Sequence, residues 1–260
     1  MRFTYSFEDH EIEAVKQIVN DKLDSGRRFV QYRHQRNVIG DAPLTDDEDL
    51  WTVHMMCLLT TQQRSGPGSP VNALLDSNPF PLSLAACRNY EPLEENVYRV
   101  LTESPGIRRT NRIAKAVREN LTSLNQGEWN NLREWRDILF EQRASSPDPV
   151  HRSTEEKAAG FMSRFLEFGP KQSRNFWQSL GLTRFTFVLD SRIIRWLRQY
   201  LEIEAGLLTT SGLSDNYYYR FVSDMLFDLC DQANVLPCMF DAAVFDSFDE
   251  DTEWTTDVIW

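Results

Sequence analysis

The chain of 260 residues is 41% hydrophobic and 12% aromatic, and it carries 28 basic against 39 acidic side chains. This composition is typical of a globular protein with one large domain or two packed lobes, and it excludes disordered and collagen-like chains. No apolar run reaches the roughly 18 to 20 residues of a membrane helix, and the N-terminus has acidic residues where a signal peptide is apolar. We therefore expect a cytoplasmic protein with no membrane partner.

Charge is unevenly distributed along the chain, whose net charge is −11. Residues 101–200 carry 17 basic and 11 acidic side chains, whereas residues 201–260 carry one and 13. A central basic block of this kind can provide an anion-binding face within an acidic protein. The acidic end, residues 246–260, is expected to be a solvated tail.

Helical periodicity dominates the chain, because apolar residues recur at spacings of three and four and few segments alternate with period two. We therefore expect an all-α protein. Capping boxes are predicted at Thr45-x-x-Glu48 and at Ser153-x-x-Glu156. The segments expected to be helical are 8–24, 49–63, 107–121, 126–142, 157–168, 171–180, 191–204, 216–234 and 239–247.

The four cysteines, Cys57, Cys87, Cys230 and Cys238, form no C-x-x-C pair, and the four histidines are scattered. Neither pattern fits a zinc or iron–sulfur site. We expect reduced and buried thiols, no metal and no cofactor.

The segment 165–201 contains the residues that indicate chemistry. It is predicted to form a helix, a tight turn at Gly169-Pro170, a second helix, a short extended link and a third helix. Proline suits the first turn of a helix, so Lys171 lies beside a helix N-terminus. A lysine there opposes the helix dipole, and the same field favours the neutral amine that Schiff-base chemistry requires. A solvated surface lysine is the alternative interpretation.

Asp190 directly precedes the predicted helix 191–204, which is the N-cap position. Capping alone explains an aspartate there, since it stabilises a helix by about 1 kcal/mol. Lys171 lies 19 residues earlier, and the two residues together are more specific than either residue alone.

These residues resemble the helix-hairpin-helix superfamily of DNA glycosylases and AP lyases, and are closest in character to the archaeal-type 8-oxoguanine glycosylases. In that family a glycine-rich hairpin ends in a lysine, and a later aspartate caps the next helix. GPK at 169–171 and VLD at 188–190 match this arrangement. LLTTQQ at 58–63 and GIRRTNRIAKAVREN at 106–120 resemble two further segments of the family.

The resemblance implies an all-α fold of two lobes with the active-site cleft between them. We expect residues 1–245 to form one such domain, with the hairpin in a lobe of about residues 50–200 and the N- and C-terminal helices in the second lobe. The family resemblance covers about residues 50 to 200 of the chain.

The same resemblance implies a bifunctional glycosylase and β-lyase that uses no cofactor. Lys171 would attack the sugar of an extruded nucleotide, and Asp190 would stabilise the charge that develops. The partner is then double-stranded DNA with a damaged or modified base, and nothing in the sequence demands more than a monomer. The lead substrate is 8-oxoguanine, because 229–245 is similar to the family's closing segment, in which Asp241 and Phe245 would hold the base.

DNA contacts are implied at the helix end that fills the gap left by the extruded base and at the hairpin. The residues in these positions are Gln62, Gln63, Arg64, Phe168, Gly169, Pro170 and Arg174. Four further basic residues are candidates for phosphate contacts, namely Arg108, Arg109, Arg112 and Lys115. The stretch 27–36 interleaves basic and aromatic residues, and two interpretations stay open: a DNA-facing arm, or an edge strand or loop packed on the core.

The sequence departs from the family pattern at three places. Glu167 replaces the first hairpin glycine, Phe245 replaces the usual tryptophan, and no cluster cysteines follow. A carboxylate near a phosphate-binding turn repels DNA, so we expect a remodelled hairpin. Two other functions are therefore kept: excision of a deliberately modified base from foreign DNA, and non-catalytic binding of DNA or protein by the same scaffold.

Overall fold

The structure, a computed structural model, describes residues 6–40, 46–201 and 208–248. Within these ranges every regular element is helical and no β-strand occurs, so the prediction of an all-α fold is confirmed. The elements are α1 (Asp9–Asp24), α2 (Arg28–Arg33), the π-helical segment η1 (His34–Ile39), α3 (Asp47–Leu59), α4 (Pro70–Leu75), α5 (Leu84–Asn89), α6 (Leu93–Glu103), α7 (Thr110–Ser123), the π-helical segment η2 (Leu124–Glu128), α8 (Trp129–Ala144), α9 (His151–Met162), α10 (Pro170–Ser179), α11 (Ser191–Tyr200), the 3₁₀ turn η3 (Gly212–Ser214), α12 (Asn216–Gln232) and α13 (Pro237–Ser247).

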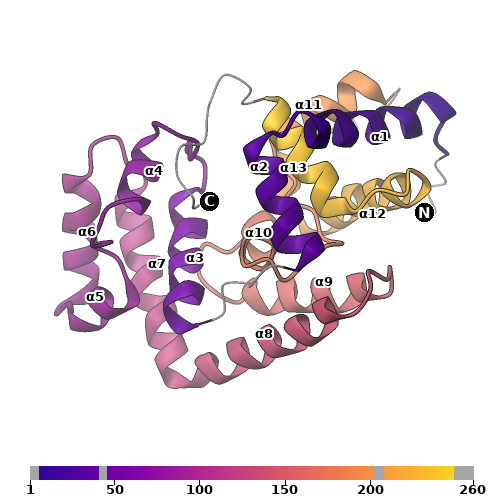
Figure 1. The fold of residues 1–260 in the computed structure, drawn as a ribbon. Coiled ribbons are helices and arrows are strands. Elements are labelled where there is room, and N and C mark those ends of the chain that lie inside the picture. Colours follow the sequence, from indigo (N-terminus) through magenta and orange to yellow (C-terminus); the bar gives the residue numbers. More distant parts are fainter. Residues whose placement is uncertain (1–5, 41–45, 202–207, 249–260) are drawn as a thin grey trace.

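The helices enclose two hydrophobic cores. The first core is built from residues between Leu50 and Leu182, and the second from residues 15–30 and 187–244. Figure 1 shows α4, α5, α6 and α7 gathered on one side of the molecule and α1, α2, α11, α12 and α13 on the other. The chain thus crosses from one core to the other in the short link between Leu182 and Phe187.

Helix α3 is the centre of the first core. Every side chain from Leu50 to Leu59 is buried except that of Thr52, and the buried set includes Trp51 and His54. A helix that is apolar all round is stable only when neighbours cover every face, and α5, α7 and α10 pack against it. The helix therefore carries its C-terminal end, and the turn after it, to a fixed position beside α10.

Helix α11 belongs to the second core, although the hairpin-bearing lobe was predicted to extend to about residue 200. Its apolar stripe, which includes Ile194 and Trp196, is buried among residues of α12 and α13. The division between the cores therefore falls before Asp190 and not after α11. As a result, Lys171 and Asp190 come from the two different cores.

Several local predictions were wrong in extent. Residues 27–36 form neither a strand nor a loop, because α2 and η1 cover them and bury Phe29 and Val30 in the second core. The helices α4, α5 and α6 were missed; α4 and α5 have only six residues each, and all three come after a segment rich in glycine and proline.

The predicted capping boxes also differ from the structure. Thr45 lies outside the described residues, and Asp46 caps α3 by accepting a hydrogen bond from the backbone N–H of Asp49. Glu48 instead accepts from the backbone N–H of Leu84, which ties α3 to α5. Helix α9 begins at His151, so the box predicted from Ser153 is wrong.

The predicted acidic tail does not begin at Asp246. That residue lies in α13, is 2% exposed and pairs with Arg27 at 2.8 Å and with Lys22 at 3.2 Å. Residues 249–260 lie outside the described residues, so the rest of the tail stays a prediction.

The four cysteine thiols are buried and unbridged. Burial raises the pKa of both Cys87 and Cys238 to about 12. In the described ranges, no group of three or more histidine, cysteine, aspartate and glutamate side chains could hold a metal ion. None of the helices in these ranges combines the length and apolarity that a membrane crossing requires.

Candidate active site

The hairpin before α10 is held from the first core. The side chain of Asn120 accepts from the backbone N–H of Leu166 at 2.8 Å and donates to its carbonyl at 3.1 Å. The amide of Asn120 also contacts His54 Nε2 at 3.0 Å. Burial lowers the pKa of His54 to about 3, so a neutral ring supports the hairpin. Gly169 is the N-cap of α10, and the predicted position of Pro170 in the first turn is confirmed.

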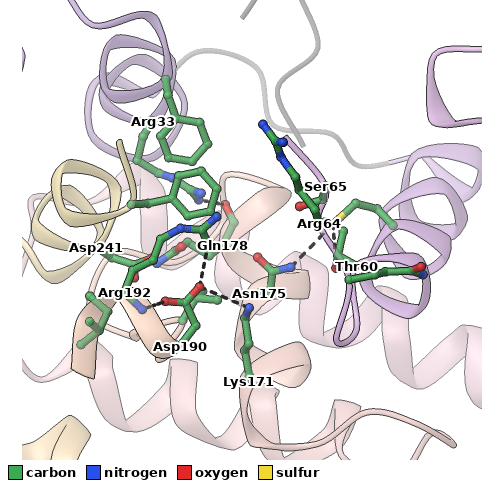
Figure 2. Close-up of a pocket in the computed structure, with 16 residues that line it drawn as sticks. Arg33, Thr60, Arg64, Ser65, Lys171, Asn175, Gln178, Asp190, Arg192 and Asp241 are labelled. Carbon is green, nitrogen blue, oxygen red and sulfur yellow. Dashed lines mark hydrogen bonds and ion pairs between the residues drawn. The ribbon is translucent and has the colours of Figure 1, made fainter. Parts of the chain in front are cut away.

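Lys171 extends from this first turn toward the aspartate of the other core. Its Nζ lies 3.6 Å from Asp190 Oδ2, and the lysine side chain is 37% exposed. Figure 2 shows Lys171 and Arg192 both directed at the Asp190 carboxylate. The two residues that the sequence indicated are therefore brought together.

Asp190 is the N-cap of α11 and also a partner of two cations. Its Oδ1 accepts from the backbone N–H of Arg192 at 2.8 Å, and its Oδ2 lies 2.9 Å from the Arg192 guanidinium. Burial alone would raise the pKa of Asp190, but Lys171, Arg192 and the backbone N–H together hold it below its ordinary value. Asp190 is therefore ionised at neutral pH; the cap interpretation is confirmed, and the role of its carboxylate in a reaction stays a prediction.

The link that carries Asp190 is fixed by side chains from two helices. Glu155 of α9 accepts from the backbone N–H groups of Arg184 and Phe185, each at 2.8 Å. Tyr219 of α12 accepts from Leu189 N and donates to the Phe187 carbonyl, each at 2.8 Å. These contacts provide hydrogen-bond partners for backbone groups of an extended segment that pairs with no strand. They also set the position of the Asp190 carboxylate.

A pocket opens between the two cores at this point. Lys171, Asn175 and Gln178 of α10 line it together with Asp190, and Asp241 of α13 lies in its wall. Figure 2 shows Arg33 and Asp241 on the side of the second core, with Thr60, Arg64 and Ser65 from the turn after α3 facing them. The pocket is thus the place where Lys171, Asp190 and Asp241 meet.

One wall of the pocket is a stack of flat groups. Phe245 lies against Phe29, with ring centroids 4.6 Å apart and planes inclined by 20°. The guanidinium of Arg192 lies over the Phe245 ring, 4.1 Å from its centroid. Phe245 therefore has two planar neighbours, and a base that stacks on it has to displace Arg192 or Phe29.

Asp241 is a buried carboxylate at the end of this wall. Its relative exposure is 7%. Burial, together with the Asp190 charge, raises the pKa of Asp241 to about 7, although Arg33, Lys171 and Gln178 oppose the shift. Near neutral pH this side chain can act as an acceptor or, when protonated, as a donor.

Three pocket residues were not found from the sequence. Gln178 is 1% exposed, and its Oε1 has no hydrogen-bond partner among the described residues. Arg33 donates to the Gln178 carbonyl at 2.9 Å and comes from a segment that was assigned no helix. The spacing of seven residues from Lys171 places Gln178 two helical turns further along the same face, and this spacing is the one sequence signal from which it could have been found. Arg192 follows Asp190 by two residues, and its role depends on tertiary packing.

The predicted DNA contacts divide into exposed and buried residues. Gln62 and Arg64 are exposed in the turn after α3, and Gln63 and Arg64 line the pocket mouth. Gly169 is also exposed. The exposed basic residues of the other predicted segment include Arg112 and Lys115.

Two predicted DNA contacts are wrong as side-chain contacts. Phe168 is 4% exposed and packs on His54 with 4.5 Å between the rings. Arg174 is 7% exposed, donates to the Pro170 carbonyl at 2.7 Å and binds the Glu156 carboxylate through two nitrogens. Both side chains are used to fasten the hairpin and α10 from within.

Comparison with solved structures identifies the fold. No protein-family model matches the sequence, and no curated protein matches it either. The structure of Methanocaldococcus jannaschii 8-oxoguanine DNA glycosylase matches with a TM-score of 0.62 and 13% identity, over 94% of this chain and 95% of that chain.

Two further structures agree with this match. Tm1821, the 8-oxoguanine DNA glycosylase of Thermotoga maritima, matches with a TM-score of 0.60 and 17% identity, over 94% of this chain and 100% of that chain. The M. jannaschii glycosylase/lyase in complex with a 15mer DNA containing 8-oxoguanine matches with a TM-score of 0.56 and 13% identity, over 94% and 99%. The chain therefore has the fold of the 8-oxoguanine DNA glycosylases.

Proposed function

We propose that this protein is a DNA glycosylase with β-lyase activity, acting on double-stranded DNA that contains a damaged or modified base. The observation that carries the proposal is the approach of Lys171 Nζ to Asp190 Oδ2, at 3.6 Å, in a pocket between the two cores. The fold of the solved glycosylases supports it.

The first step is entry of the extruded nucleotide into the pocket, because its glycosidic bond cannot be reached within the base stack. Gln62, which is exposed in the turn after α3, then occupies the gap in the duplex. The hairpin and the exposed Arg64 and Arg112 then contact the phosphates.

The second step is displacement of the base by Lys171. The amine gives up a proton and forms a bond from Nζ to C1′ of the sugar, while the glycosidic bond breaks and the departing base takes up a proton. Ionised Asp190 stabilises the positive charge that develops on the sugar. Opening of the sugar ring gives an imine, and loss of a C2′ proton with departure of the 3′ phosphate completes strand cleavage.

The lead substrate is an oxidised purine, with 8-oxoguanine as the first candidate. A guanine-type base presents N–H groups along its edge, and the Asp241 carboxylate and the Gln178 Oε1 atom are two buried acceptors. Phe245 provides a ring for stacking. Buried polar groups of this kind discriminate strongly between bases, because a base that leaves them without hydrogen bonds has a less favourable free energy of binding.

Borohydride trapping tests the proposal. Labelled duplexes carry 8-oxoguanine, an abasic site or only normal bases, and the proteins are the wild type, Lys171→Ala and Asp190→Asn. Lys157→Ala is the matched control, because Lys157 is exposed on α9, outside the pocket between the cores. We expect an adduct with 8-oxoguanine DNA that Lys171→Ala abolishes, that Asp190→Asn slows and that Lys157→Ala leaves unchanged.

Other outcomes separate the remaining functions. An adduct with the abasic duplex alone would retain Lys171 as the nucleophile and direct the search to other bases, including modified bases of foreign DNA. No adduct with any duplex would contradict the lyase activity and favour a non-catalytic role.

A further inference from the structure

Backbone strain is concentrated in three neighbouring turns, which form a rim beside the pocket residues Gln63 and Arg64. Four non-glycine residues in the described ranges have positive φ, and three of them, Gln62 (57°), Arg109 (63°) and Glu167 (69°), lie in neighbouring turns. Such conformations cost free energy and persist where surrounding contacts enforce them, which is common at functional sites. The three turns follow α3, precede α7 and precede α10.

An ion pair joins these turns. Arg109 donates to Glu167 Oε2 at 2.5 Å and contacts the Thr61 carbonyl at 3.5 Å. Arg108 donates from its side chain to the Gln62 carbonyl at 2.8 Å. Glu167 is thus tied to the segment before α7, and Arg108 and Arg109 tie that segment to the turn after α3.

The carboxylate is placed where an anion is attracted. Glu167 precedes Gly169, the N-cap of α10, by two residues, and the N-terminus of a helix favours negative charge. Its side chain is 22% exposed and lies between two guanidinium groups, since Arg112 is 3.9 Å away and 67% exposed. A DNA phosphate that approached the hairpin would compete with Glu167 for these two cations.

We propose that Glu167 is a built-in competitor of the DNA backbone, which holds Arg109 and Arg112 in the free protein and yields them to a phosphate on binding. The proposal rests on the proposed function. The competition weakens binding to any duplex whose base does not enter the pocket. Selectivity between damaged and undamaged DNA then depends more on insertion of the base than on contacts with phosphates.

The charge of Glu167, and not its shape, is the basis of this inference. A residue that only formed the turn would be glycine, which adopts positive φ without strain. Glutamate keeps the strained backbone and adds a carboxylate on a surface that faces DNA. Its replacement by glutamine removes the charge and leaves the size and the backbone requirement unchanged.

The test is the affinity of Glu167→Gln for an undamaged duplex, measured by fluorescence anisotropy over a range of salt concentrations. We expect binding roughly 3- to 30-fold tighter at low salt, as one or two charge-assisted hydrogen bonds provide. The slope of log affinity against log salt should steepen by about 0.9 for each additional phosphate that the variant neutralises. The preference for 8-oxoguanine over undamaged DNA should fall.

Two further variants locate the effect. Glu94→Gln makes the same change of charge in an ion pair with Arg118, away from the rim, and should leave affinity unchanged. In an Arg109→Gln background, Glu167→Gln should tighten binding less, because the released guanidinium is missing. Glu167→Gly removes both the charge and the backbone strain, and it should also bind undamaged DNA more tightly. It replaces Glu167→Gln in the test if that variant folds poorly.

Two results would overturn the proposal. Glu167→Gln and Glu167→Gly could both bind undamaged DNA no more tightly than the wild type, or Glu94→Gln could tighten binding equally. Failure of the wild type and all variants to bind any duplex would instead overturn the proposed function itself.

Discussion

Asp190 has two tasks that can be separated by substitution. Asparagine is as good an N-cap as aspartate, so Asp190→Asn should keep α11 and lose stability only through the ion pairs with Lys171 and Arg192. It removes the negative charge beside Lys171, and the rate of base excision should fall by about 10² to 10⁴ under single-turnover conditions. Base excision at the wild-type rate would show that the residue is a cap alone.

Asp241 makes stability depend on pH. Its pKa is raised from an ordinary value of 3.8 to about 7, so the folded protein binds this proton more tightly than the unfolded chain does. The stability that the proton contributes is complete below pH 3.8 and is lost as pH rises to about 7. Glu155, whose pKa burial raises to about 7, acts in the same direction.

Asp241→Asn tests this dependence because it removes the titrating group. Urea unfolding at about pH 5 and about pH 7.5 should show a smaller fall in the free energy of unfolding for the variant than for the wild type. An unchanged difference between the two pH values would mean that Asp241 is ionised throughout this range.

At the scale of elements, the hairpin depends on an amide from α7. Asn120→Ala removes both hydrogen bonds to Leu166 and leaves buried groups unsatisfied, which should cost about 2 to 4 kcal/mol of stability. Urea unfolding measures the loss, and Asn131→Ala on the exposed face of α8 is the control. A loss no greater than that of the control would contradict the assigned role.

The sequence predicted the elements that bear the chemistry better than it predicted their surroundings. Lys171 and Asp190 were found because each is placed by its own helix start, a local signal. The roles of Arg33, Gln178 and Arg192 depend on contacts between segments far apart in the chain. Arg174 was misassigned for the same reason, because its burial against Glu156 is invisible in the sequence.

For the whole molecule, the all-α fold class followed from the helical periodicity of the sequence. The boundary between the two cores did not, because the segment that resembles the family, about residues 50 to 200, extends past that boundary. The cores are separated at a short link, residues 183–186, which no composition change marks. The tail prediction failed similarly, because Asp246 looks like the first of many solvated acids and is in fact buried.

The second core should depend on that buried aspartate. Asp246→Asn removes the carboxylate that Arg27 binds at 2.8 Å, between the N-terminal helices and α13. Breaking a buried pair costs about 3 kcal/mol, and thermal unfolding should show a lower midpoint. An unchanged midpoint would mean that the pair is replaced by solvent at no cost.

The stack of Phe29 on Phe245 joins the two ends of the described chain within the pocket wall. During synthesis, Lys171 and Asp190 leave the ribosome well before α13 does, and domains form as their last elements emerge. A nascent chain therefore carries Lys171 and Asp190 before the Phe29–Phe245 stack can form. Under the proposed function, the pocket would become selective for a base only when α13 docks.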